Sequence, residues 1–256
     1  MMWDADQYLK FADERSRPFF DLLAQVRCEQ PATIVDLGCG PGNLPRAAAD
    51  RWPKARVLGM DNSANMLAQA RPLAIPGRLE FELADVETWS PPQPVDLILS
   101  NAALQWVRQH DRLLPRLAAM VAPGGTLAVQ LPDFFHMPAH AAIDAVAGEP
   151  RWAAKLASAG VPRDSVQPLA WYVHRLIELG FAVNAWQTTY YHVLRGENPV
   201  LEWFKGSALR PFLQLLDEAA AKEFLSEVGV RLLAEYPAKH DVTLLPFPRL
   251  FFVGTR

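Results

Sequence analysis

One loop constrains this chain more than any other feature. Val35-Asp36-Leu37 has the pattern of a buried strand end, and Gly38-Cys39-Gly40-Pro41-Gly42 separates it from a helical pattern. Glycine is required where a backbone turns sharply or where a ligand approaches it closely. A loop between a strand and a helix also presents backbone N–H groups to a ligand. The sequence therefore predicts a ligand-binding turn here, with an ordinary tight turn as the alternative.

The spacing of the glycines distinguishes between ligands. A dinucleotide-binding loop requires G-x-G-x-x-G/A, but the sixth position is Asn43 counted from Gly38 and Pro45 counted from Gly40. A Walker loop requires Gly-Lys-Ser/Thr, which the sequence lacks. A pyrophosphate ligand is therefore disfavoured. S-adenosylmethionine (SAM) has no phosphate and carries cationic sulfonium and ammonium groups, so an acid such as Asp36 beside the loop favours it.

Strands and helices alternate through the first half of the chain. The expected strands are Ala32–Leu37, Arg56–Met60, Leu79–Leu83, Val95–Ser100 and Thr126–Leu131. Helical patterns cover Asp6–Val26, Leu44–Trp52, Ala64–Arg71 and Arg112–Val121. This alternation predicts an α/β fold, a Rossmann-like doubly wound parallel sheet with helices on both faces.

The second half has a different organisation. Helices are expected at Ala141–Ala159, Ser165–Leu179, Val200–Leu216 and Glu218–Tyr236, and strands at Val183–Leu194 and Leu245–Thr255. Pro246 and Pro248 begin the last strand, and proline cannot donate to a strand ladder, so this start is expected to be irregular or at an edge. We expect one domain over 1–256, with an N-terminal helical cap (1–30), a SAM-binding core (31–132) and a helical insertion (196–241) that forms part of the substrate site.

Polar side chains stand at successive strand ends. Asp61 ends the second strand and could accept both hydroxyls of a ribose, although it could also cap the next helix. Asp85 follows the third strand and could accept the adenine amino group, with Val86 beside the ring. Asn101 ends the fourth strand. The expected cofactor-binding residues are Asp36, Gly38, Gly40, Asp61, Asn62, Met66, Asp85, Val86, Asn101 and Gln105.

Composition excludes several classes of protein. With 25 basic and 28 acidic residues the net charge is −3, which gives no electrostatic basis for binding nucleic acid. Two cysteines are too few for a disulfide framework or a zinc cluster, so no metal site is expected. The N-terminus does not resemble a signal peptide, and no apolar run is long enough to span a membrane. These features favour a cytoplasmic protein with no obligate protein partner.

The ordered motifs between Ala32 and Leu131 resemble those of the class I SAM-dependent methyltransferases. Asp36, the glycines, Asp61, Asp85 and Pro123-Gly124-Gly125 carry the resemblance. It implies a seven-stranded sheet whose last strand is antiparallel to the others. It also implies SAM as the cofactor and S-adenosylhomocysteine (SAH) as its product.

A closer resemblance covers nearly the whole chain. The segments that carry it are 3–11, 14–18, 101–107, 130–133, 202–211 and 247–251, and they are similar to the trans-aconitate methyltransferases, which esterify one carboxylate of this tricarboxylate. The region Leu104-Gln105-Trp106 is also similar to the malonyl-carrier-protein methyltransferases. This second match, confined to the core, leaves a carrier protein or another small acid as the alternative substrate.

Methyl transfer to a carboxylate requires no general base, because free carboxylates are ionised at neutral pH. We therefore expect no dedicated catalytic residue, since proximity and orientation can supply most of the rate. A tricarboxylate does require cations, and arginine binds carboxylates with two parallel hydrogen bonds. Candidate cations are Arg15, Arg17, Arg195, Lys205, Arg210 and Arg249, with Arg210 first and Arg15 second. Tyr8, Trp106 and His140 complete the expected substrate-binding set, although each could instead be structural.

Overall fold

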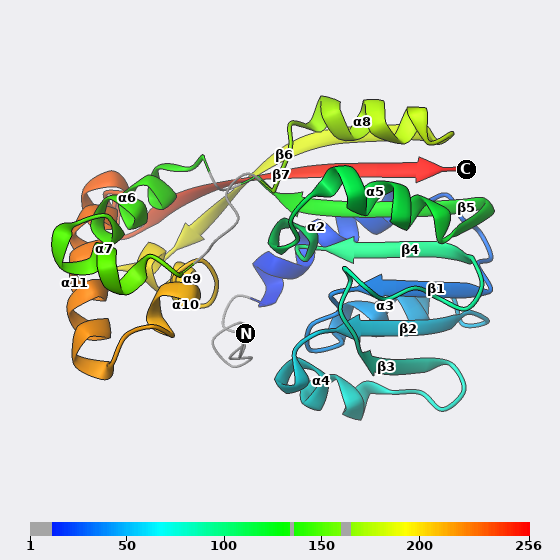
Figure 1. The fold of residues 1–256 in the computed structure, drawn as a ribbon, viewed down its shortest axis with the longest axis horizontal. Coiled ribbons are helices and arrows are strands. Elements are labelled where there is room, and N and C mark those ends of the chain that lie inside the picture. The colour runs from blue at the N-terminus through cyan, green and yellow to red at the C-terminus, as the bar shows by residue number, and fades with distance from the viewer. Residues whose placement is uncertain (1–11, 134–135, 160–164) are drawn as a thin grey trace.

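The computed structural model describes residues 12–133, 136–159 and 165–256, with side chains from Ser16 onward (Figure 1). The elements of the first half are α2 (Ala12–Ala24), β1 (Thr33–Leu37), α3 (Asn43–Arg51), β2 (Arg56–Asp61), α4 (Ala64–Ala70), η1 (Arg71–Leu73), β3 (Leu79–Leu83), β4 (Val95–Asn101), η2 (Leu104–Trp106), α5 (His110–Ala119) and β5 (Val121–Pro132). The later elements are α6 (Pro138–Ala147), α7 (Pro150–Leu156), α8 (Leu169–Glu178), β6 (Ala182–Leu194), α9 (Pro199–Lys205), α10 (Arg210–Leu213), α11 (Glu218–Glu235) and β7 (Thr243–Thr255). None of the helices among these residues is long and apolar enough to cross a membrane.

The strands form one seven-stranded sheet in the order β3-β2-β1-β4-β5-β7-β6. Neighbours from β3 through β5 are parallel, whereas β7 is antiparallel to both β5 and β6. Only the last strand therefore runs against the others, as expected. β2 and β3 are added on one side of β1, whereas β4 and β5 are added on the other side. In open α/β sheets, ligands bind at such a switch point.

Helices cover both faces of the sheet, which confirms the doubly wound architecture. On one face α2 and α3 pack against the central strands through a cluster that includes Phe19, Leu22 and Ala48. On the other face α5 and α8 contribute Leu117 and Leu176 to a second cluster. Burial on both sides explains why the central strands are nearly continuous apolar runs.

The two last strands extend beyond the rest of the sheet. β6 and β7 pair along their whole length, from Ala182 with Thr255 to Leu194 with Thr243, but β5 reaches only as far as Arg249 of β7. Pro246 and Pro248 therefore lie where β7 has a neighbour on one side only, which confirms the expected edge position. This two-stranded extension leads into a separate helical lobe (Figure 1).

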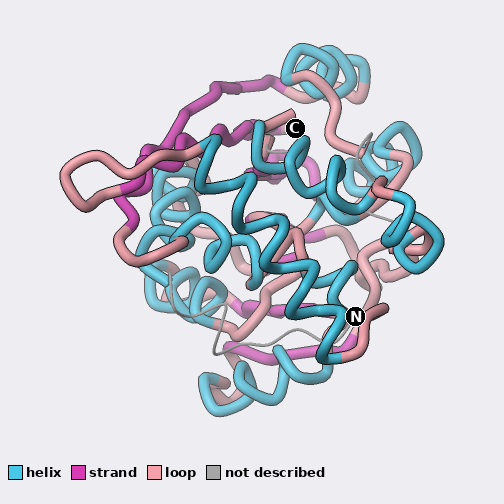
Figure 2. Tube along the Cα trace, turned by 90° about the vertical axis from the view of Figure 1, so that its left-hand side faces the viewer, coloured by secondary structure: helices cyan, strands magenta, loops and turns pink. Residues whose placement is uncertain are grey.

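The helical lobe contains α6, α7, α9, α10 and α11, and it faces the viewer in Figure 2. Its core joins Trp152 of α7, Trp203 of α9 and Phe224 of α11, all nearly or fully buried. The lobe thus includes α6 and α7, which precede β6, in addition to the helices within the expected insertion at 196–241. Two insertions, before and after β6, build one hydrophobic core, because neither helical segment alone covers its own apolar face.

Three helices are shorter in the structure than the sequence pattern predicts. Gly148 and Pro150 divide the expected helix Ala141–Ala159 into α6 and α7, and Gly206 divides Val200–Leu216 into α9 and α10. Proline is favoured in the first turn of a helix, and Pro150 accordingly begins α7. In the same way α8 begins only after Pro168 instead of at Ser165. Pro123-Gly124-Gly125, which carries part of the resemblance, is an irregular stretch inside β5, where the register with β4 shifts.

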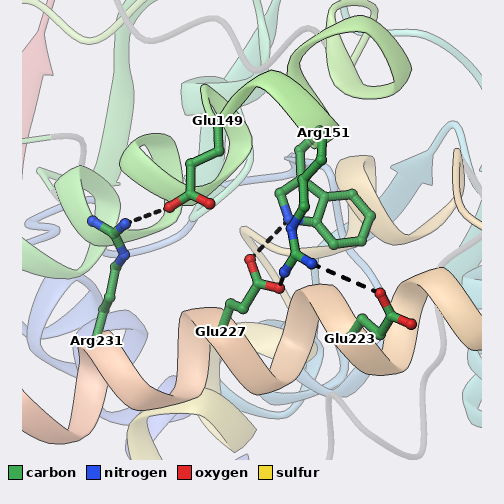
Figure 3. Close-up of polar contacts among 6 residues, drawn as sticks. Glu149, Arg151, Glu223, Glu227 and Arg231 are labelled. Atoms are coloured by element: carbon green, nitrogen blue, oxygen red, sulfur yellow. Dashed lines mark hydrogen bonds and ion pairs between the residues drawn. The ribbon is translucent and has the colours of Figure 1, made fainter.

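Ion pairs connect α7 and the residue before it to α11 (Figure 3). Arg231 donates to Glu149 at 2.5 Å, and Arg151 pairs with Glu227 and, at 3.9 Å, with Glu223. Glu227 also accepts a hydrogen bond of 2.9 Å from the indole nitrogen of Trp152. Of these acids only Glu227 supports a buried side chain, and its own side chain is 27% exposed.

Replacing Glu227 with alanine is expected to lower the free energy of unfolding by about 1–2 kcal/mol, because it leaves the indole N–H of Trp152 without an acceptor. Glu223→Ala is the matched control from one turn earlier. Its side chain is 67% exposed, so its loss should change the stability by less than about 0.5 kcal/mol. Chemical denaturation of both variants measures the difference, and equal effects would contradict the role of the Trp152 contact.

Candidate functional site

The expected cofactor residues gather at one edge of the sheet, where the parallel strands end. β1 leads into the glycine loop, β2 ends at Asp61, and β4 ends at Asn101. The loop is attached to this edge because the backbone N–H groups of Gly38 and Cys39 both donate to the carbonyl of Met60, at 2.8 and 2.9 Å. The arrangement matches the crevice in which open α/β sheets bind their ligands.

Two glycines of the loop are required for different reasons. Gly38 has φ +76°, and a Cβ atom there would lie 2.3 Å from the Cβ of Ala103, so the loop packs closely against the turn after β4. Gly40 has φ +55°, but a Cβ atom there would meet nothing within 4 Å. Its backbone therefore faces open space at the sheet edge, as a ligand-binding loop requires.

Asp61 connects the second strand to the glycine loop. Its Oδ2 accepts a hydrogen bond of 2.9 Å from the N–H of Gly40, and its Oδ1 accepts one of 2.8 Å from the N–H of Ser63. Each carboxylate oxygen can accept a further hydrogen bond. The helix cap proposed as an alternative role belongs instead to Ser63, whose hydroxyl accepts from Met66 at the start of α4. Asp61 thus remains available to a ligand beside Gly40.

Asp36 is the most deeply buried acid at this edge, with 1% of its surface exposed. Its Oδ2 has no hydrogen-bond partner among the described residues. Burial, together with the neighbouring charge of Asp61, raises the pKa of Asp36 to about 7. Burial likewise raises the pKa of Asp61, while hydrogen bonds from Ser63 and Gly40 oppose this change. Two acids held in this way favour a cationic ligand.

The turn after β4 is strained and carries two further buried acceptors. Ala102 has φ +53°, an unusual conformation for a residue with a side chain. Gln105 donates from Nε2 to the carbonyl of Ala102 at 2.7 Å, which leaves its Oε1 buried. Neither this oxygen nor Oδ1 of Asn101 has a donor among the described residues.

A buried hydrogen-bond chain holds this turn in place. His110 contacts the carbonyl of Leu104 through Nε2 at 2.9 Å and the hydroxyl of Tyr172 through Nδ1 at 2.6 Å. A carbonyl only accepts, so Nε2 carries the proton and the tyrosine hydroxyl donates to Nδ1. Burial lowers the pKa of His110, which agrees with a neutral ring. The turn that contains Gln105 is therefore anchored to α8.

The other expected cofactor residues differ in exposure. Asp85 is exposed, and its Oδ1 accepts from the N–H of Glu87 at 2.8 Å, so it closes a local turn. Arg116 donates to the carbonyl of Val86, which fixes this turn to α5. Asn62 is exposed, while Met66 is buried under the first turn of α4. The roles of these four residues toward SAM remain predictions.

Three of the substrate-binding candidates lie in or against the helical lobe. Trp106 ends η2 and packs against the hydrophobic core of the lobe. His140 of α6 is 1% exposed and makes an edge-on contact with the ring of Phe204, at 5.4 Å between centroids. Arg210 begins α10 and is half-buried. Tyr8 lies outside the described residues, as does the side chain of Arg15.

A buried pair at the same sheet edge joins one expected candidate cation to a residue that was not expected in the site. Gln130 near the end of β5 is fully buried, and Arg249 of β7 is 3% exposed. Arg249 donates to Oε1 of Gln130 at 3.0 Å. The sequence pattern predicts Arg249 as one of several candidate cations for the substrate, but it predicts no role for Gln130 in the site. Two-residue alternation along β5 places Gln130 on the same face as buried Ala128, and this signal could have revealed it.

Comparison with known proteins identifies the family. A family model described as a methyltransferase domain matches residues 34–125. The chain is 50% identical over 255 residues to the trans-aconitate 2-methyltransferase of Methylobacterium nodulans, covering 99% of this chain and 98% of that protein. It is 49% identical to the protein of the same name from Streptomyces avermitilis, covering 98% and 96%. This chain belongs to the trans-aconitate 2-methyltransferase family.

The fold agrees with this membership. A solved structure of phosphoethanolamine N-methyltransferase 2 from Haemonchus contortus, in complex with S-adenosyl-L-methionine, superposes with a TM-score of 0.56 at 18% identity. The match covers 94% of this methyltransferase and 52% of that chain. The chain is therefore a SAM-dependent methyltransferase with the class I fold, which confirms the expectation from its motifs.

The site of this methyltransferase fits SAM chemically. Its buried side-chain oxygens without a donor among the described residues are Oδ2 of Asp36, Oδ1 of Asn101 and Oε1 of Gln105. All three are acceptors, and burial without a donor is costly for each. The ammonium group of SAM has N–H donors, and its sulfonium adds a positive charge near the two acids. An anionic ligand at this position would face these three oxygens.

Proposed function

We propose that this enzyme transfers the methyl group of SAM to one carboxylate of trans-aconitate. The supporting observation is the set of buried acceptors beside the glycine loop, together with the family's shared sequence over nearly the whole chain. The relatives are named for this substrate and for position 2, so the same regiochemistry is proposed here. Both cysteines are free thiols, as expected of the cytoplasmic location that we propose.

Bound SAM supplies an electrophilic methyl group, and the substrate carboxylate is already ionised. In our proposal Asp36, Asn101 and Gln105 hold the polar end of the cofactor, and Asp61 holds its ribose. Val86 and Asp85 receive the adenine. The helical lobe and Trp106 exclude water from the reacting oxygen. No side chain is assigned as an acid or a base, because the rate comes from alignment of the two reactants.

The direct test is incubation of the purified enzyme with isotopically labelled SAM and trans-aconitate. We expect a labelled monomethyl ester, identified by mass spectrometry, and fragmentation locates the methylated carboxylate. Malonyl carrier protein and a panel of dicarboxylates serve as the competing substrates. A labelled carrier protein without any trans-aconitate ester would replace the proposed substrate by the alternative one.

Arg210 is the substrate cation that we propose in the helical lobe. Arg210→Ala is expected to raise the KM for trans-aconitate roughly 10- to 150-fold and to leave the KM for SAM unchanged, since a charge-assisted hydrogen bond contributes about 1.5–3 kcal/mol. Arg195→Ala is a control, because Arg195 is an exposed residue between β6 and α9. Steady-state kinetics with each substrate varied in turn measures both constants. Equal increases in the two KM values would remove Arg210 from the substrate site.

A further inference from the structure

A row of buried polar side chains crosses the sheet on the face covered by α2 and α3. Its members are Asp36 on β1, Asn101 on β4, Gln130 on β5 and Arg249 on β7, with exposures of 1%, 6%, 0% and 3%. Each stands two residues along its strand from an apolar residue of the α2 and α3 cluster, namely Ile34, Leu99, Ala128 and Phe251. Alternate residues of a strand share a face, so the four polar side chains point to the same side.

The row runs from the cofactor side of the enzyme to the helical lobe. Asp36 precedes the glycine loop. Arg249 pairs with Pro132 at the point where β7 loses β5 as a neighbour and continues toward the lobe. Asn101 and Gln130 are register partners between these ends. The row thus connects the cofactor side with the junction of the sheet and the helical lobe.

The orientation of Gln130 follows from its partner. A guanidinium group has only donors, so the oxygen of the Gln130 amide must face Arg249, as the 3.0 Å contact shows. The amide nitrogen therefore points away from the guanidinium. It is fully buried and has no acceptor among the described residues. A buried amide N–H group without an acceptor is unfavourable, which indicates that a ligand oxygen satisfies it.

The guanidinium itself is held in a fixed position. Gln130 binds it from one side, and the ring of Phe247 lies 4.9 Å from its central carbon. A guanidinium has five N–H donors and can therefore hold several partners at once, Gln130 among them. Buried arginine of this kind suits a carboxylate better than lysine does, because the planar group forms two parallel hydrogen bonds.

We propose that Gln130 and Arg249 form the receptor for a carboxylate of the substrate that is not methylated. Its oxygens accept hydrogen bonds from the amide nitrogen of Gln130 and from the guanidinium of Arg249. The inference rests on the proposed function, since a tricarboxylate keeps two anionic groups while the third reacts. In this proposal the preference for polycarboxylates depends on two residues of the sheet, Gln130 and Arg249, in addition to Arg210 of the lobe.

Two variants test this receptor in different ways. Arg249→Met removes the charge and keeps an apolar side chain of similar length. Gln130→Glu keeps the shape of the side chain and can form an internal ion pair with Arg249, so the variant should fold normally. It also replaces the N–H donors of Gln130 by a negative charge, which repels a substrate carboxylate. Both should raise the KM for trans-aconitate about 30-fold or more, while the dissociation constant of SAM changes less than about twofold. Arg256→Met is the matched control, because Arg256 follows the opposite end of the same strand and donates to the carbonyls of Ala118 and Val121.

A second measurement separates this inference from the proposed function. Titration of trans-aconitate into the SAH-bound enzyme reports binding without turnover, and crotonate serves as a ligand with a single carboxylate. In the wild type the tricarboxylate should bind far more tightly than crotonate, and both variants should lose this preference. Retention of the preference in both variants would overturn the receptor even if the wild type makes the ester. Binding that depends on Arg249 without any ester formation would instead overturn the proposed reaction and keep the receptor.

Discussion

Replacement of Asp61 with alanine is expected to weaken SAM binding by about 1–3 kcal/mol, or roughly 5- to 150-fold in the dissociation constant. Two effects combine. The proposed ribose hydroxyls lose their acceptor, and the N–H groups of Gly40 and Ser63 lose theirs. The second effect disorders the loop on which the cofactor rests. Calorimetric titration of SAM and SAH into the variant measures the loss.

Asp61→Asn keeps the size of the side chain and changes its hydrogen-bonding pattern. An amide retains one oxygen acceptor but places an NH₂ group against one of the two backbone N–H groups, so the loop should be affected even though the size is unchanged. Asp50→Ala is a suitable control, because Asp50 is exposed and pairs with Arg46 one turn earlier in α3. A dissociation constant for SAM that is unchanged in Asp61→Ala would refute the ribose assignment.

SAM affinity is expected to rise with pH through neutrality, because Asp36 must be ionised to hold a cation. Its pKa is raised to about 7 in the unliganded enzyme. A bound cation favours the carboxylate and lowers this pKa, so binding releases a proton when it occurs below pH 7. Affinity should fall by up to about tenfold for each pH unit below 7 and should be nearly constant above pH 8. Titrations between pH 5.5 and 8.5 in buffers of different ionisation enthalpy measure both the affinity and the released proton.

The same shift affects the unliganded protein in the opposite sense. A carboxyl group whose pKa is higher in the folded state than in the unfolded state stabilises the fold at low pH, and this contribution is lost as pH rises from about 4 to 7. SAM should therefore raise the melting temperature more at pH 8 than at pH 6. Asp36→Asn should abolish this difference and the proton release together. A variant that keeps the pH dependence would assign it to another group.

Much of the fold was predictable from local patterns. The five parallel strands and the antiparallel last strand are where apolar runs and turn residues indicated, because burial on both faces requires continuous apolar strands. Helix ends were less predictable. Gly148 and Pro150 interrupt a stretch whose apolar pattern continues across them. The joint core of the lobe was not visible in the sequence either, since Trp152 and Phe224 belong to helices that lie on either side of β6 in the sequence.

The cofactor side of the site was predictable for the same reason as the strands, because its residues follow the strand ends in order. The sequence placed Asp36, Asp61 and Asn101 correctly at one edge. The substrate side depends on contacts between distant segments. Gln130 and Arg249 are 119 positions apart in sequence, and each alone resembles an ordinary polar residue in a strand. Only the pairing of β5 with β7 shows that they form one unit.

The position of β7 has a consequence for how the enzyme is made. β7 is made after the other six strands of the sheet, yet it lies between β5 and β6 and is the strand to which β6 pairs. Until β7 emerges from the ribosome, β6 has no place in the sheet and the two insertions of the lobe have no common support. The cofactor half can thus assemble during synthesis, whereas the substrate half must wait for β7. Deletion of β7 would therefore act on substrate recognition before it acted on cofactor binding.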